Sequence, residues 1–178
     1  MIYVLDTNVF SSALINLDLS VFIDIYSPWS SLIAEGRIVS CHEVFRELGR
    51  YFQKEDENLV WLNSNKACFQ EMTDEEGKIL RDIYSHRKFQ EGVKEKNILQ
   101  GNPEADAMLV AKAKACGGVV VTCEKNYTPN SAKIPTIAVT FGVKFMPLPE
   151  FYRMLKNLHN GNEELLNVQI YDHLLPRE

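Results

Sequence analysis

The sequence predicts an α/β domain built on a mainly parallel sheet. Short runs rich in β-branched residues alternate with stretches of helical character, which is the pattern of a parallel sheet with connecting helices. The chain has 178 residues, of which 46% are hydrophobic, enough for one domain with a sizeable core. The expected strands are residues 2–5, 37–40, 119–122 and 136–140, with a last short strand at 144–146.

Helix signals separate these strands in the first half of the chain. Ser27-Pro28 predicts a helix start with proline in the first turn, and Gly36 predicts its end. Residues 40–43 have the S-x-x-E pattern of a capping box, in which Glu43 would bond back to the backbone of Ser40. Residues 73–76 repeat this pattern before a further helix.

Two more helices are expected in the second half. Asn102-Pro103 predicts the start of an alanine-rich helix that ends at Gly117, a suitable left-handed terminator. Residues 147–157 predict an amphipathic helix after the last strand. We therefore expect one domain over residues 1–160, followed by a tail, residues 161–178, to which the sequence assigns no role.

Composition narrows the classes of function. The net charge of −5 argues against a protein that coats nucleic acid through a general positive field, but permits an enzyme that gathers acids around a metal. No apolar stretch reaches the roughly 18 residues needed to span a bilayer, and no basic segment with a signal core opens the chain. The sequence therefore favours a cytoplasmic protein without a membrane partner.

Acidic residues follow two of the expected strands. Asp6 ends the first strand and Glu124 comes just after the strand at 119–122. The carboxyl ends of parallel strands form the usual ligand-binding edge of such a sheet. A lone acid in this place could equally cap the following helix, so Asp6 alone is a weak signal.

Two helical acids can reach the same edge. Glu47 lies four residues after Glu43 on the helix that leaves the second strand, and without the other acids an ordinary exposed position would be the favoured interpretation. Asp106 shares a helix row with Val110 and Ala113, where an unpaired buried carboxylate would cost several kcal/mol. Clusters of oxygen ligands suit Mg²⁺ or Mn²⁺. The four acids, Asp6, Glu47, Asp106 and Glu124, are the candidate metal ligands.

These residues together resemble the PIN-domain nucleases, which include the VapC-type toxins of toxin–antitoxin pairs and a PIN-like subgroup of uncharacterised proteins. The resemblance spans residues 1–158 and is carried by residues 4–8, 40–48, 106–118 and 120–124. It implies a three-layer sandwich with a five-stranded sheet in the order 3-2-1-4-5. It also implies Asp6, Glu47 and Asp106 in the three principal acidic positions. Glu124 stands where the family usually has Asp, sometimes Asn.

The resemblance implies hydrolysis of RNA phosphodiester bonds with Mg²⁺ or Mn²⁺, a homodimer, and an antitoxin protein as partner. Thr7, Asn8 and Thr122 would orient the acids or the phosphate, although Asn8 could equally be a helix cap. Two alternatives stay open. One is a catalytically silent domain that binds RNA or protein. The other is a small-molecule phosphatase, against which Asn8 counts, because dehalogenase-like phosphatases need a second Asp there.

Overall fold

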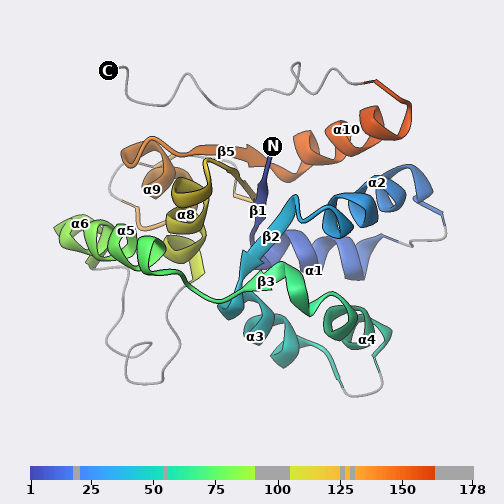
Figure 1. Cartoon of the computed structure of the whole chain (residues 1–178), viewed down its shortest axis with the longest axis horizontal. Coiled ribbons are helices and arrows are strands. Elements are labelled where there is room, and N and C mark those ends of the chain that lie inside the picture. The colour runs from blue at the N-terminus through green and yellow to red at the C-terminus, as the bar shows by residue number, and fades with distance from the viewer. Residues whose placement is uncertain (18–20, 54–55, 91–104, 125–126, 129–130, 163–178) are drawn as a thin grey trace.

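The computed structural model describes residues 1–17, 21–53, 56–90, 105–124, 127–128 and 131–162 (Figure 1). The strands are β1 (Tyr3–Leu5), β2 (Ile38–Cys41), β3 (Phe69–Gln70), β4 (Val119–Thr122) and β5 (Lys144–Pro147). The helices are α1 (Thr7–Asn16), α2 (Ile23–Ala34), α3 (His42–Tyr51), α4 (Glu57–Ser64), α5 (Asp74–Ser85), α6 (Arg87–Gln90), α8 (Ala105–Cys116), α9 (Ile134–Thr140) and α10 (Leu148–His159), with a 3₁₀ turn, η1, at Lys66–Cys68.

The five strands of the described chain form one parallel sheet in the order β3-β2-β1-β4-β5. Tyr3 of β1 aligns with Ile38 of β2 on one side and with Val119 of β4 on the other. The predicted α/β class and strand order are confirmed. The reversal of strand order at β1 and β4 creates a switch point, and ligands of open α/β sheets bind beside such a point.

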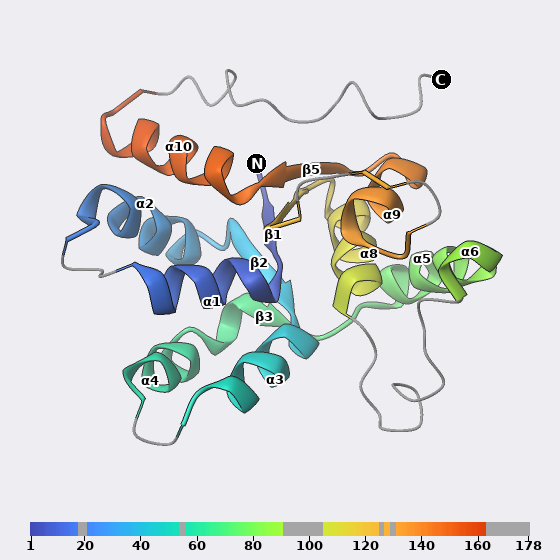
Figure 2. The same ribbon diagram turned by 180° about the vertical axis from the view of Figure 1, so that it is seen from behind.

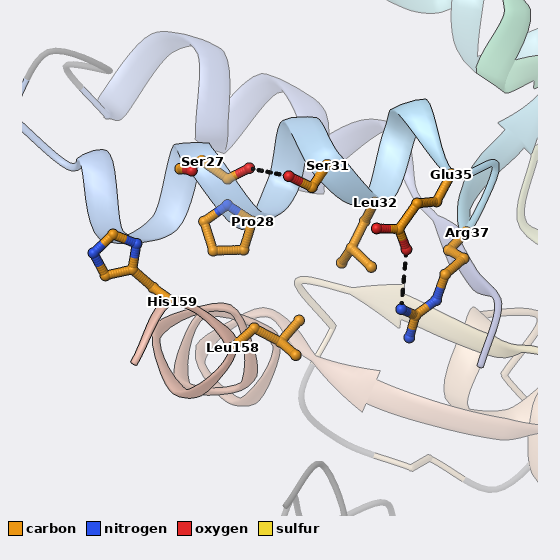
Figure 3. A pocket seen from close by; sticks show the side chains of 8 residues that line it. All are labelled: Ser27, Pro28, Ser31, Leu32, Glu35, Arg37, Leu158 and His159. Carbon is orange, nitrogen blue, oxygen red and sulfur yellow. Dashed lines mark hydrogen bonds and ion pairs between the residues drawn. The ribbon is translucent and has the colours of Figure 1, made fainter. Parts of the chain in front are cut away.

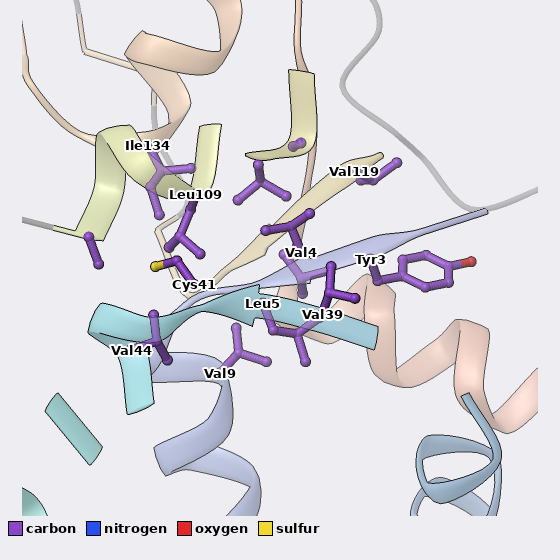
Figure 4. Packing of buried hydrophobic residues seen from close by; sticks show 14 of the residues in the cluster. Tyr3, Val4, Leu5, Val9, Val39, Cys41, Val44, Leu109, Val119 and Ile134 are labelled. Atoms are coloured by element: carbon purple, nitrogen blue, oxygen red, sulfur yellow. The ribbon is translucent and has the colours of Figure 1, made fainter. Parts of the chain in front are cut away.

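Helices cover both faces of the sheet, so the central strands are buried on each side. All three residues of β1 and all four of β4 are buried, as expected for parallel strands between two helical layers. Figure 4 shows Val9 of α1 and Val44 of α3 on one face, with Leu109 of α8 and Ile134 of α9 on the other. The architecture is thus a three-layer sandwich (Figures 1 and 2).

The strand predicted at 136–140 is wrong, because this segment lies in helix α9. Pro135 occupies the first turn of α9, where its fixed φ suits a helix, and Gly142 follows the helix with a φ of 65°. Helical capping at both ends outweighs the β-propensity of Thr136, Val139 and Thr140. The remaining strand of the sheet is β3, whose two residues are too few to show a pattern in the sequence.

The start predicted for the helix at Ser27-Pro28 is also wrong. Helix α2 begins earlier, at Ile23, and Pro28 lies inside it with a buried ring. The predicted end is confirmed, since the helix closes before Gly36, whose φ is 68°. The second strand, expected at 37–40, is shifted by one residue.

Other helix boundaries follow the sequence signals. Thr73 and Glu76 form the predicted capping box at the start of α5. The predicted start of a helix at Asn102-Pro103 lies outside the described residues. Helix α8 is described from Ala105 and ends before Gly117, whose φ is 63°. Helix α10 covers most of the predicted amphipathic segment. The proposed tail, 161–178, lies outside the described residues beyond residue 162.

Helix length bears on membrane insertion. Within the residues described above, no helix is both long enough and apolar enough to cross a bilayer.

Candidate functional site

The carboxyl edge of the sheet brings the ends of four segments together. Asp6 directly follows β1, and Glu124 lies two residues beyond β4. Helix α3 leaves the same edge after β2. Helix α8 returns toward β4, so its first turn, which contains Asp106, lies at this edge as well. The topology therefore directs residues from distant parts of the sequence to one place.

Asp6 is the most deeply buried of the four candidate acids, with 4% of its surface exposed. The Thr122 hydroxyl donates to Asp6 Oδ2 at 3.1 Å and itself accepts from the Glu124 backbone N–H at 3.1 Å. The Asp6 pKa is raised from 3.8 to about 7, mainly by burial and also by the charges of Asp106 and Glu124, while its hydrogen bonds lower the pKa by less. The ionised form of Asp6 is therefore destabilised by burial and by the negative charges near it.

Glu47 lies on α3 and is bonded to α1. The hydroxyl of Thr7, one residue after Asp6, donates to Glu47 Oε2. Burial raises the pKa of Glu47, and the charge of Asp106 adds to this effect, whereas the Thr7 bond and Arg50 lower the pKa. The interpretation of Glu47 as an ordinary exposed glutamate is thus excluded.

Asp106 is electrostatically connected to the other three acids. Its charge raises the pKa of Asp6, of Glu47 and of Glu124. Its own pKa is raised by burial and lowered by Lys133, whose Nζ lies 3.5 Å from Asp106 Oδ2. As predicted, Val110 and Ala113 on its helix row are buried.

Glu124 has a structural contact in addition to its place among the acids. Its Oε2 accepts the backbone N–H of Ile134 at 3.0 Å, at the N-terminus of α9, and its Oε1 lies 3.7 Å from Lys133 Nζ. Burial and the charge of Asp106 raise its pKa. The glutamate thus accepts a backbone hydrogen bond at the N-terminus of α9.

The predicted capping box of Ser40 and Glu43 is wrong. Ser40 belongs to strand β2, and its hydroxyl donates to the carbonyl of Leu5 at 2.7 Å, which ties β2 to β1. The residue before α3 is Cys41, whose side chain makes no capping hydrogen bond. Glu43 instead lies 3.4 Å from Arg46.

This correction adds Glu43 to the surroundings of the site. Its charge raises the pKa of Glu47, which lies one helical turn away. The i, i+4 spacing of the two glutamates already placed them on one face of the helix. The capping pattern, however, led to the prediction that Glu43 bonds to the backbone of Ser40. Lys133 was missed entirely, because nothing in its local sequence marks it.

The three predicted orienting residues fall into two groups. Thr7 and Thr122 both donate hydroxyl hydrogen bonds to candidate acids. Asn8 is exposed in the first turn of α1 and is not the helix cap, since Asp6 precedes that helix.

The donor set fits a hard cation held partly through water. It consists of carboxylates whose pKa values are all raised, an arrangement that a divalent cation would relieve. Within the described ranges, no three side chains of His, Cys, Asp or Glu form a ready-made metal cage. Mg²⁺ commonly binds through only one or two carboxylates and retains several waters.

A separate hollow lies at the opposite edge of the sheet. This cavity of about 300 Å³ lies between α2 and α10, and its polar lining includes Ser31, Glu35, Arg37 and His159 (Figure 3). Arg37 pairs with Glu35 at 3.2 Å. None of the four acids lines this cavity, so the carboxyl edge remains the candidate site.

Comparison with known proteins gives one match. A family model described as "Domain of unknown function (DUF4411)" matches residues 3–159, a range that includes Asp6, Glu47, Asp106 and Glu124. No curated protein and no solved structure matches the chain.

Proposed function

The chain belongs to the DUF4411 family, and from its acidic site we propose that it is a ribonuclease that hydrolyses RNA phosphodiester bonds with Mg²⁺ or Mn²⁺. One observation carries the proposal. Four carboxylates from separate segments lie toward the carboxyl edge of the sheet, where the charge of Asp106 raises the pKa of each of the other three. This repulsion destabilises the fold, and a functional cation would explain its presence.

Asp6 and Asp106 are the proposed principal ligands. Asp6 is held by Thr122, and Asp106 lies at the electrostatic centre of the group. Glu47 and Glu124 would act directly or through water. A bound Mg²⁺ or Mn²⁺ supplies charge neutralisation at the phosphate and activation of the attacking water.

The remaining steps depend on groups of the chain itself. Thr7 fixes Glu47 and Thr122 fixes Asp6, so both carboxylates are oriented before substrate arrives. In the reaction, water would form a new bond to phosphorus, the bond to the leaving oxygen would break, and that oxygen would take a proton from the solvent. Glu47, which the Thr7 hydroxyl holds, is the proposed base for the proton that the attacking water loses.

The choice of RNA as substrate rests on the resemblance to PIN-domain nucleases. The same resemblance supports a cytoplasmic toxin that forms a homodimer and is held by an antitoxin. A catalytically silent RNA- or protein-binding domain and a small-molecule phosphatase are the competing functions.

Cleavage of single-stranded RNA by purified protein in Mn²⁺ tests the proposal. We expect Asp106→Asn and Glu47→Gln to lower the rate at least about 100-fold, because each removes a charge that the cation requires. Asp82→Asn and Glu75→Gln, which change exposed acids on α5, are the matched controls. Cleavage of RNA at an undiminished rate by both site variants would refute the assignment. Hydrolysis of a small phosphomonoester without RNA cleavage would favour the phosphatase.

Glu43 provides a finer test of the site. Glu43→Gln should preserve cleavage within about threefold, since Glu43 acts only through the charge that it places near Glu47. Removing this charge should lower the pKa of Glu47 and shift the acid limb of the pH–rate profile to lower pH. A loss of activity as large as that of Glu47→Gln would instead place Glu43 among the ligands.

A further inference from the structure

Lys133 bridges two of the four candidate acids. Its Nζ lies 3.5 Å from Asp106 Oδ2 and 3.7 Å from Glu124 Oε1, although 60% of its side chain is exposed. The residue directly precedes α9, and its backbone is extended. A lysine from a fifth segment thus lies within ion-pair distance of two of the acids.

Fold stability does not explain this placement well. The lysine end of both ion pairs is exposed, so solvent screens its charge, and ordering a long lysine side chain costs entropy. Lys133 lowers the pKa of both Asp106 and Glu124, so in the absence of another cation it partly neutralises them. The ammonium group lies next to carboxylate oxygens that a divalent cation would use as ligands.

We propose that Lys133 is a phosphate-binding residue, whose ammonium rests on Asp106 and Glu124 until a divalent cation binds there and it turns to the phosphate of the substrate. This inference rests on the proposed function. A divalent cation at Asp106 would repel the ammonium and take over its role toward the carboxylates. An arriving phosphate brings negative charge beside the cation, and lysine commonly binds phosphate as a point charge.

The anchoring of Lys133 suits such a movement. The backbone after it is fixed, because Glu124 accepts the N–H of Ile134 at the start of α9. The side chain has a flexible four-carbon stem and three donors, and 60% of it is exposed. A fixed base with a movable charged end can exchange partners without any change of fold.

The first test measures binding of Mn²⁺ alone by isothermal titration calorimetry at pH 8, with no RNA present. Lys133→Met should bind Mn²⁺ about three- to tenfold more tightly than the wild type, because a competing cation is removed. Lys133→Arg, which keeps the charge, should bind Mn²⁺ as the wild type does. Lys156→Met is the matched control, since Lys156 is 64% exposed and pairs with Asp24 at 3.6 Å, away from the site.

The second test uses adenosine 5′-monophosphate in excess Mg²⁺, a phosphate monoester without a phosphodiester bond to cut. Lys133→Met should bind this probe about tenfold more weakly than wild type, whereas Lys133→Arg and Lys156→Met should bind it normally. Circular dichroism confirms that each variant is folded.

The outcomes separate this inference from the proposed function. A wild type that binds no Mn²⁺ would overturn both. The second outcome is a wild type that binds Mn²⁺ and cleaves RNA while Lys133→Met keeps the same affinity for Mn²⁺ and for the monophosphate. That outcome would overturn only the role of Lys133.

Discussion

The electrostatic strain at Asp6 predicts that the metal-free protein loses stability as the pH rises. A folded-state pKa of about 7 instead of 3.8 means that the folded chain holds this proton more tightly than the unfolded chain. The stability is therefore unaffected below pH 3.8 and falls as the pH rises toward 7, with the full loss above that pH. Each tenfold change in proton affinity corresponds to about 1.4 kcal/mol, so the full loss is about 4 kcal/mol.

Asp6→Asn removes this proton and hence the part of the pH dependence that arises from Asp6. By linkage, the wild type should have lost less than half of this stability at pH 5 and nearly all of it, about 4 kcal/mol, at pH 8. Asparagine does not ionise, so the variant should be more stable than the wild type at pH 8, by up to about 4 kcal/mol, or roughly 10 °C in Tm. Its polar oxygen can still accept the hydrogen bond of Thr122.

Urea unfolding at pH 5 and pH 8, with a chelator present, measures the effect. The wild type should lose about 2–3 kcal/mol between the two pH values relative to Asp6→Asn. The exposed control Asp82→Asn should behave as the wild type. Equal pH dependence in wild type and Asp6→Asn would refute the reasoning, as would a variant that is less stable than wild type at pH 8. Mn²⁺ should raise the free energy of unfolding of the wild type at pH 8 but not that of Asp6→Asn.

Three further predictions concern contacts that support the fold and the site. Lys112→Met should lower the free energy of unfolding, measured with urea, by about 3–5 kcal/mol, because it leaves the buried Glu76 carboxylate, 2.9 Å away, without its cation. The double variant with Lys112→Met and Glu76→Gln should recover most of this loss. Glu124→Ala should destabilise the protein by about 1 kcal/mol, because the hydrogen bond from Ile134 is lost. It should also raise the Mn²⁺ concentration needed for half-maximal cleavage about 10- to 100-fold. Glu124→Gln should keep the stability. Ser40→Ala should lower the free energy of unfolding by about 1 kcal/mol, since the hydrogen bond from β2 to β1 is lost. The Mn²⁺ concentration needed for cleavage should not change. A higher concentration would show that this hydrogen bond positions the site.

The sequence by itself determined the class of the fold and the first candidates for the site. Alternating strand and helix patterns predicted a parallel sheet, and acids at two strand ends predicted its functional edge. Asp6 and Asp106 could be identified because each interrupts an apolar pattern with a charge. Such patterns are local, and local patterns are visible in a single sequence.

The tertiary structure decided which side chains are partners. Ser40 and Glu43 match a capping box in sequence, yet Ser40 bonds to β1 because the strand extends one residue further than its pattern suggests. Lys133 reaches Asp106 across 27 positions and the start of α9 reaches Glu124 across ten. Contacts of this kind depend on how the chain packs, and no local propensity encodes them. The raised pKa of Asp6 likewise arises only when folding removes water and brings Asp106 and Glu124 near.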